Sequence, residues 1–478
     1  MADLESALGA IVGEAGVLTA EADKKKYLTD WPGANTGRAA AVVRPASTAE
    51  VSGVLKWANE TGTPVFPQGG NTATSGGAVP DGAGHSIVLS LERMKRVRET
   101  SVSARTITVE AGVVLQEIHR LAEERDLFFP LSLGAQGSCM IGGNLATNAG
   151  GINVVRYGNA RELCLGLEAV LPDGRVMDVL TGLHKDNTGY DLRDLFIGSE
   201  GTLGVITAAT LKLFPLPKAR ATAFAAVPDI NRALELLNRM QAETGGAVEA
   251  FEMIPKLMME QYEKHLPHLK RPFADPPDLS ILMEVAATSD REAAPADDGT
   301  VPVTAQLEAI LGEAFETGHV TDAVIAAAEQ QRLEFWELRE SAYEAVVKSG
   351  PRIGFDISLP LDQVHDFVAN TEAAVEGIFP GAKLSSVGHL GDGNLHYTVY
   401  PPDGGADRLE ELRAEIKRAV LDSVGGYRGS FSAEHGIGDS KLAEMAAYKD
   451  PVAIEVMKSI KAALDPNGIM NPGRVLPA

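Results

Sequence analysis

Cysteine is almost absent from this sequence, which has only Cys139 and Cys164 among 478 residues. Two thiols exclude a disulfide framework, an iron–sulfur motif and a zinc site built from cysteines. The chain also lacks any apolar run that approaches the roughly 18 residues of a membrane-spanning helix. No membrane span is therefore expected.

Basic charge is also scarce. Lysine and arginine total 43 against 65 aspartate and glutamate residues, which gives a formal net charge of −22. Binding to nucleic acid in general needs a basic surface, so nucleic acid is not an expected partner. The acidic excess is better explained as a solvated exterior. Because the stretch MADLESALGAIVGEAGV has no basic segment before an apolar core, we expect a cytoplasmic protein.

Two common nucleotide-binding signatures are missing. No GxGxxG opens a helix after an N-terminal strand and no GxxxxGK[ST] occurs, so a Rossmann site and a P-loop are disfavoured. Glycine is nevertheless dense at 67–77, 134–151 and 197–207. Since glycine lets backbone N–H groups approach a phosphate closely, these loops indicate another phosphate-bearing cofactor. The alternative is that they are ordinary loops of a chain with 49 glycines.

The length predicts two or three domains, because 478 residues exceed one ordinary hydrophobic core. A helical lead-in covers 1–34. Short β-rich runs and amphipathic helices then alternate over 35–217, up to a proline-rich exit. The stretch 218–439 mixes strands with long helices, including a helical pattern over 322–349, and a helical, turn-rich segment covers 440–478.

One of the amphipathic helices can be placed closely. The stretch AEVSGVLKWANETG predicts a helix over 47–60 that opens at Ser47-Thr48 and stops at Gly62. The helical period places four apolar side chains on one face, Val51, Val54, Leu55 and Ala58.

The stretch GHLGDGNLHYTV, at 388–399, holds two histidines seven positions apart. Its Gly-Asp-Gly-Asn core is a poor helix former and a good turn, so we expect a hairpin that folds His389 back beside His396. Two converging imidazoles can chelate zinc or a similar divalent ion. A pair of half-buried, hydrogen-bonded histidines explains these residues equally well.

The stretch SAEHGIG places Glu434 and His435 side by side. In a regular strand, neighbouring side chains point to opposite faces, so the carboxylate could bind a metal while the imidazole meets a substrate. With His389 and His396, Glu434 would complete a two-histidine, one-glutamate set with open positions. The alternative is a salt-bridging surface glutamate beside a loop histidine.

Several stretches, taken together, resemble one family over roughly 35–475. In order, they are GSCMIGGNLATNAGG, RYGNARELCLGLEAVLPDGRV, DNTGYDLRDLFIGSEGTLGVIT, GHLGDGNLH, SAEHGIG and MNPGRVL. They are similar to the FAD-dependent 2-hydroxy acid dehydrogenases of the vanillyl-alcohol oxidase fold, which include D-lactate dehydrogenases, the flavin-binding component of glycolate oxidase and D-2-hydroxyglutarate dehydrogenases. The resemblance implies an α+β fold: a two-subdomain FAD-binding domain at 35–217, an antiparallel-sheet cap with the metal site at 218–439, and a segment at 440–478 that returns to the flavin.

The resemblance also implies which residues bind FAD. They are Pro67, Gln68, Gly69, Gly70, Asn71, Thr72, Gly137, Ser138, Gly142, Gly143, Asn144, Thr147, Asn148, Gly150, Gly201, Ile206 and Asn471. Covalent flavoproteins of this fold carry a histidine where this chain has Asn71, so the resemblance implies noncovalent FAD.

The remaining site residues follow in the same way. His389, His396 and Glu434 match the family's metal ligands, and zinc or manganese is the expected ion. His435 matches its catalytic base, and Arg339 matches an arginine that pairs with the substrate carboxylate. Such a site suits oxidation of a hydroxy acid, because a metal lowers the pKa of the hydroxyl, histidine accepts its proton and FAD takes the hydride.

The match departs from the D-2-hydroxyglutarate branch at two contacts to a second carboxylate, where that branch has a threonine and a lysine and this chain has Tyr343 and Gly354. Losing a cation there disfavours a buried second carboxylate, although Arg352 could substitute. We expect Tyr343 and Trp336 to lie on the helix of Arg339 and to pack against an apolar substrate side chain, unless they are core residues. The expected substrate is a D-2-hydroxy monocarboxylate such as D-lactate or larger.

Other assignments stay open. D-2-hydroxyglutarate or D-malate is the alternative substrate, and an oxidase that uses O2 is the alternative enzyme. A flavin-free metallohydrolase or metal-binding module is a hypothesis from another class. The chain has no cluster of its own, so electrons would leave to an electron-transfer flavoprotein, a quinone or a cytochrome, and the chain could also be one component of a larger electron-transfer complex. We expect a homodimer.

Overall fold

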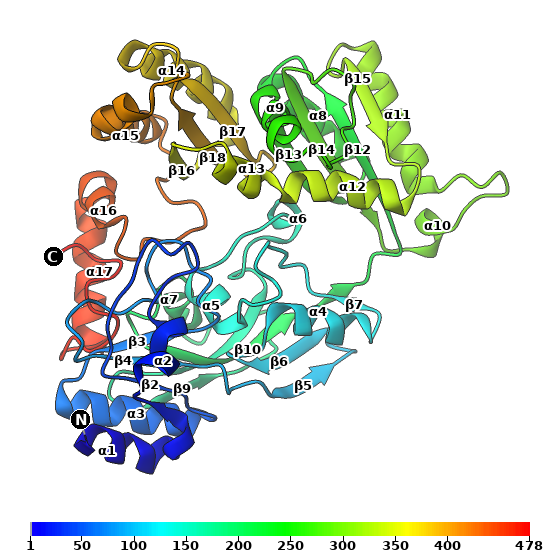
Figure 1. Cartoon of the computed structure of the whole chain (residues 1–478). Helices are drawn as coiled ribbons and strands as arrows, with labels where there is room; N and C mark the ends of the chain where they lie inside the picture. Colours follow the sequence, from blue (N-terminus) through cyan, green and yellow to red (C-terminus); the bar gives the residue numbers. More distant parts are fainter. Residues whose placement is uncertain (1) are drawn as a thin grey trace. The chain divides into compact units, whose positions relative to one another are not determined.

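A computed structural model describes residues 2–478; Met1, the first residue of the expected lead-in, lies outside them. The chain divides into two compact units (Figure 1). Unit 1 comprises residues 2–151, 158–215 and 434–478, and unit 2 comprises residues 152–157 and 216–433. Relative to the expected domains, the first boundary lies slightly earlier, and the segment 434–439 belongs to unit 1.

Unit 1 contains two main sheets. The first has the order β1-β2-β4-β3, with β2, β4 and β3 parallel. Its strands are β1 Val17–Leu18, β2 Ala41–Val43, β3 Val65–Gln68 and β4 Ile87–Ser90. The second is antiparallel, in the order β5-β6-β10-β8-β9. Its strands are β5 Val97–Ser101, β6 Thr106–Glu110, β8 Cys164–Val170, β9 Val176–Val179 and β10 Val205–Lys212. A short pair joins β7 Leu127–Phe128 and β11 Phe214–Pro215.

The helices of unit 1 include α1 Ala2–Val12, α3 Thr48–Thr61, α4 Leu115–Glu123, α5 Ile141–Ala146, α7 Leu192–Phe196, α16 Leu442–Tyr448 and α17 Pro451–Leu464. Helix α3 begins and ends as the sequence predicts. The Ser47 side chain accepts the backbone N–H of Glu50, and Gly62 ends the helix with a φ of 66°. The four apolar side chains of the expected face are fully buried.

Unit 2 is built on one seven-stranded antiparallel sheet in the order β15-β12-β14-β13-β17-β18-β16. The strands are β12 Ala219–Ala226, β13 Val248–Pro255, β14 Leu279–Ala287, β15 Asp322–Ile325, β16 Ile353–Ser358, β17 Lys383–His389 and β18 Asn394–Tyr400. Its helices include α6 Val154–Tyr157, α8 Ile230–Glu243, α9 Lys256–His265, α11 Pro302–Glu316, α12 Glu329–Glu340, α13 Ala342–Lys348, α14 Val364–Ile378 and α15 Ala406–Gly426.

The two faces of this sheet are buried by different helices. One core joins the sheet to α8, α11, α14 and α15 and contains Phe251 and Tyr397. The other joins it to α9, α12 and α13 and contains Phe224 and Trp336. Successive residues of a strand alternate between these cores. An antiparallel sheet with helices on its faces agrees with the expected α+β class.

Part of the sequence reading for unit 2 was wrong. Residues 322–325 form strand β15 rather than helix, because they pair with β12 at the edge of the sheet. The rest of the helical pattern is broken at Ser341, between α12 and α13. Among residues 2–478, no helix combines the length and the apolar character needed to cross a membrane.

Candidate functional site

A row of polar side chains crosses four neighbouring strands of unit 2. Residues paired across strands lie on the same face of a sheet, and the pairs are Glu252 with His389, His389 with Asn394, and Asp356 with His396. Since Asn394 and His396 are two residues apart on β18, all five side chains belong to one face. The sheet register therefore collects charged and imidazole groups from β13, β17, β18 and β16.

The two histidines of the GHLGDGNLH stretch meet as the hairpin prediction requires. Strands β17 and β18 are joined by the predicted turn, in which Gly393 has a φ of 81°. The imidazole centroids of His389 and His396 are 5.6 Å apart, with the rings inclined at 78°. The hairpin is confirmed, and it places both imidazoles on the polar row.

Glu252 is a site residue that sequence reasoning missed. Its side chain is buried, Oε1 lies 2.8 Å from Nδ1 of His389, and Oε2 accepts from Nε of Arg339 at 2.8 Å. Burial acts to raise the pKa of this carboxyl, but His389 and Arg339 together hold it below its ordinary value. A glutamate inside the apolar strand VEAFEMIP was the available signal, because a buried charge needs partners.

The expected substrate contacts from the stretch 322–349 lie in different settings. Arg339, on α12, is 9% exposed and faces Glu252, whereas Tyr343 is 50% exposed and lies on α13. Trp336 is a core residue whose indole N–H donates to Glu284 at 2.9 Å. The break at Ser341 thus corrects the expectation that one helix carries Arg339 and Tyr343, and Trp336 takes the core alternative.

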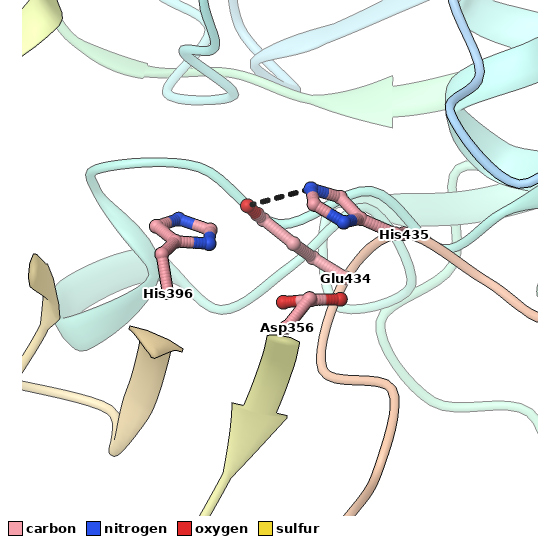
Figure 2. Close-up of side chains that lie close together, drawn as sticks. All are labelled: Asp356, His396, Glu434 and His435. Carbon is pink, nitrogen blue, oxygen red and sulfur yellow. Dashed lines mark ion pairs between the residues drawn. The ribbon is translucent and has the colours of Figure 1, made fainter. Parts of the chain in front are cut away.

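The metal-ligand candidates continue into the segment after Ala433, whose backbone N–H donates to the carbonyl of Asp356 at 3.2 Å. Residues Glu434 and His435 follow in an irregular loop, not the expected strand. Asp356, His396, Glu434 and His435 each offer one ligand atom, and these atoms lie within 4.8 Å of one another (Figure 2). Nε2 of His435 is 4.0 Å from Oε1 of Glu434.

These donors fit a divalent metal. Imidazole nitrogens and carboxylate oxygens are ligands of both zinc and manganese. The group contains His396 and Glu434 of the expected set and adds Asp356, which the sequence reading missed. His389 is not in the group, but it lies beside His396. Its Nδ1 is hydrogen-bonded to the carboxylate of Glu252, and such a carboxylate partner is typical of metal-binding histidines.

In unit 1, the glycine-rich stretches converge. A Cβ built on Gly70 would lie 2.2 Å from the carbonyl oxygen of Ser138, and one on Gly201 would lie 3.1 Å from the Pro67 ring. The C-terminal segment joins them, because the N–H of Asn471 donates to Val65. Four regions distant in sequence therefore meet around the end of β3.

Three asparagines in these loops have an unmet hydrogen-bonding capacity. The side-chain oxygens of Asn71, Asn144 and Asn471 are buried and find no donor among the described residues. Asn71 and Asn471 also adopt positive φ angles of 55° and 43°. Buried hydrogen-bond acceptors without donors are uncommon. Residues with strained backbone angles are found together most often at ligand sites. The loops therefore fit a cofactor that is rich in hydroxyl and N–H donors, as FAD is.

Other residues of the FAD prediction are already committed to the protein. The Thr147 hydroxyl donates to the carbonyl of Gly143, Oδ1 of Asn148 accepts the N–H of Arg161, and Ile206 is buried in β10. Their predicted contacts to FAD stay predictions. Gly137 and Ser138 are exposed residues.

Glu200 and Ser75 anchor the loop that carries His435. The Glu200 carboxylate accepts the N–H groups of Ile437 and Gly438 at 2.7 and 2.8 Å, and the Ser75 hydroxyl donates to the carbonyl of His435. Burial raises the pKa of Glu200, while the two N–H donors oppose that rise. Nothing in the sequence assigned this anchoring role to either residue, because both contacts are made only in the folded chain.

Comparison with known proteins identifies the family. Residues 39–180 match the family described as FAD binding domain, and residues 216–475 match FAD linked oxidases, C-terminal domain. The chain is 39% identical to the mitochondrial D-2-hydroxyglutarate dehydrogenase of Bos taurus, over 94% of this chain and 79% of that protein. It is 35% identical to the D-2-hydroxyglutarate dehydrogenase of Xanthomonas citri pv. viticola, over 96% and 93%.

Solved structures share the fold at low identity. A crystal structure of p-cresol methylhydroxylase with substrate bound superimposes with a TM-score of 0.73 at 16% identity, over 99% of this chain and 96% of that one. The 4-ethylphenol oxidase from Gulosibacter chungangensis gives 0.71 at 19% identity, over 100% and 97%. These likenesses confirm the fold class.

The comparisons also correct one expectation. The relatives from Bos taurus and Arabidopsis thaliana are named as mitochondrial proteins, which overturns the expectation of a cytoplasmic protein. That expectation rested on a missing targeting segment, and such an absence is not evidence for a compartment.

The matched families, the relatives and the fold agree on one conclusion: the chain belongs to the FAD-linked oxidase family, among the FAD-dependent D-2-hydroxy acid dehydrogenases of the vanillyl-alcohol oxidase fold.

Proposed function

We propose that this enzyme oxidises a D-2-hydroxy acid to the 2-oxo acid at a divalent metal site, with D-2-hydroxyglutarate as the first substrate to test. The observation that carries the proposal is the group of His396, Glu434 and Asp356 beside His435, next to His389. Imidazole and carboxylate donors that share one small space are suited to a cation, and a nearby histidine is suited to a proton.

The residues divide the chemistry among them. When bound, FAD accepts a hydride and the metal lowers the pKa of the substrate hydroxyl. His389, His396 and Glu434 would hold the metal, and His435 would accept the hydroxyl proton on an imidazole nitrogen. Arg339 binds the substrate carboxylate through its guanidinium, which limits the orientations of the α-carbon.

The side chain of the substrate has two candidates. Relatives named for D-2-hydroxyglutarate support a second carboxylate. Arg352 precedes β16 with the same alternation as Gly354 and Asp356, so its guanidinium is the candidate cation for that carboxylate. Space over Gly354 supports this, since a Cβ there would meet no described atom within 4 Å. The missing lysine at that position supports a monocarboxylate such as D-lactate.

Finer features belong to the same proposal. Asn71, in place of a histidine, supports noncovalent FAD, and the nitrogen and oxygen donors support zinc or manganese. We propose that electrons pass to an electron-transfer flavoprotein, a quinone or a cytochrome, and that the chain forms a homodimer.

The test is anaerobic mixing of the FAD- and metal-loaded protein with D- and L-2-hydroxy acids, followed by the visible absorption of the flavin. Bleaching by a D-acid that a chelator and His435→Ala abolish is the expected result. The acid with the highest kcat/KM identifies the side chain. If no 2-hydroxy acid bleaches protein that carries FAD and metal, the proposal is wrong.

A further inference from the structure

The buried carboxylate of Glu252 joins two residues to which the proposed function gives separate tasks. Oε1 lies 2.8 Å from Nδ1 of His389, while Oε2 lies 2.8 Å from Nε and 2.7 Å from Nη2 of Arg339. We propose that Glu252 is a positioning residue that sets the metal-binding nitrogen of His389 and the orientation of the Arg339 guanidinium together. The inference rests on the proposed function and deepens it.

The contact to His389 determines which nitrogen can bind a metal. Glu252 and His389 are direct partners across β13 and β17, so the backbone of the sheet holds their separation. An ionised carboxylate only accepts hydrogen bonds, so it selects the imidazole with a proton on Nδ1. That tautomer leaves Nε2 with a lone pair, which is the form that binds a divalent ion.

The contact to Arg339 determines which edge of the guanidinium faces a substrate. Oε2 of Glu252 accepts the Nε–H of Arg339 and lies 2.7 Å from Nη2, so the ion pair runs along the Nε–Nη2 side of the guanidinium and orients the planar group. The edge formed by Nη1 and Nη2 is then the edge that a carboxylate would bind with two parallel hydrogen bonds. With Arg339 only 9% exposed and Glu252 fully buried, neither side chain has room for many alternative orientations.

A glutamine at position 252 keeps the shape but cannot serve both neighbours in the same way. If its oxygen faces Arg339, its amide N–H2 faces Nδ1 of His389 and moves the imidazole proton to Nε2. If its oxygen faces His389, its amide N–H2 faces the N–H groups of Arg339, and donors then meet donors with no acceptor between them. The variant should therefore weaken metal binding, substrate binding or both, whereas a change confined to Arg339 should weaken substrate binding alone.

The experiment compares E252Q with the wild-type full-length, FAD-containing protein by titration with Zn²⁺ after chelation, and by steady-state kinetics at saturating Zn²⁺. We expect the dissociation constant for Zn²⁺ to rise about 10–100-fold, the KM for the hydroxy acid to rise, or both. E249Q is the matched control. Glu249 lies on the same strand, is equally buried and pairs with Arg156 and Arg220, so its loss should change neither constant.

The outcomes separate this inference from the proposed function. Wild-type protein that binds Zn²⁺, with an unchanged Zn²⁺ affinity and KM in E252Q, overturns the inference alone. Wild-type protein that binds neither Zn²⁺ nor Mn²⁺ overturns the metal site and the inference with it. If E252Q does not fold, R339Q is compared with the double variant E252Q/R339Q instead. The double variant removes both the carboxylate and the guanidinium, so neither charge is left buried without its partner. Equal Zn²⁺ affinity in these two overturns the inference, and weaker binding in the double variant supports it.

Discussion

Gly70 and Ser138 approach so closely that a Cβ on Gly70 would lie 2.2 Å from the Ser138 carbonyl oxygen. No side chain fits this space, so the two glycine-rich loops can meet only if residue 70 is glycine. The contact links the stretch after β3 to the stretch before α5, the two parts of the chain with the most predicted FAD contacts.

Gly70→Ala should therefore separate these loops and release FAD. We expect a lower ratio of flavin to protein absorbance after purification, with partial recovery when excess FAD is added. Gly134→Ala is the control, because a Cβ there meets no described atom within 4 Å. Equal FAD content in the two variants would contradict the role assigned to Gly70.

His396→Ala should remove a metal ligand and lower the metal content of the purified protein. Loss of one of few ligands weakens chelation strongly, so we expect substoichiometric zinc or manganese by elemental analysis and little turnover. His119→Ala is the control, because His119 is bonded to the carbonyl of Leu131 in unit 1, outside this site. A full metal content in His396→Ala would remove His396 from the ligand set.

His435→Gln should lower kcat while the metal stays bound. Loss of a general base typically costs about 10²–10⁴-fold in rate, and kcat from steady-state kinetics measures that loss. Substitution of the exposed His184 by glutamine serves as the control. If His435→Gln loses the metal instead, then His435 is a ligand rather than the base.

Gly354→Lys should shift substrate preference toward dicarboxylic acids. The position shares the face of Asp356 and His396 and has open space above it, so a lysine there can meet a second carboxylate. We expect kcat/KM for D-2-hydroxyglutarate to rise relative to D-lactate, and Arg352→Met should shift the ratio the other way. An unchanged ratio in both variants would place the substrate side chain elsewhere.

Glu168→Gln should make the free energy of unfolding less dependent on pH in the acidic range. Oε1 of Glu168 accepts from Thr48, Thr207 and Arg98. Burial opposes ionisation, but these donors hold the pKa of Glu168 below its ordinary value. A lowered pKa means that the ionised carboxylate stabilises the fold above the unfolded pKa of about 4.3, and that this contribution is lost as pH falls through the folded pKa.

The variant should accordingly lose about 1–3 kcal/mol of unfolding free energy at pH 7, as for a buried hydrogen-bonded charge. The gap to wild type should narrow toward pH 3, as measured by urea denaturation at several pH values. A gap that stays constant with pH would show that shape, not charge, sets the contribution of Glu168.

The sequence by itself determined the local elements and the family. Helix α3 and the β17–β18 hairpin are specified by local signals: Ser47 caps the start of the helix through Glu50, Gly62 ends it, and the Gly-Asp-Gly-Asn turn closes the hairpin. Their hydrogen bonds are short-range, so spacing predicts them. The motifs in order were enough to identify the FAD-dependent dehydrogenases, and the comparisons confirm this.

The tertiary structure decided what depends on register and packing. Glu252 meets His389 only because β13 pairs with β17 across more than a hundred residues, and Asp356 joins His396 only through the β16–β18 register. Residues 322–325 became a strand because β12 offered an edge, although their pattern favoured helix. Contacts of this kind are made by backbone pairing between distant segments, and residue type within a segment carries little information about which strand lies opposite.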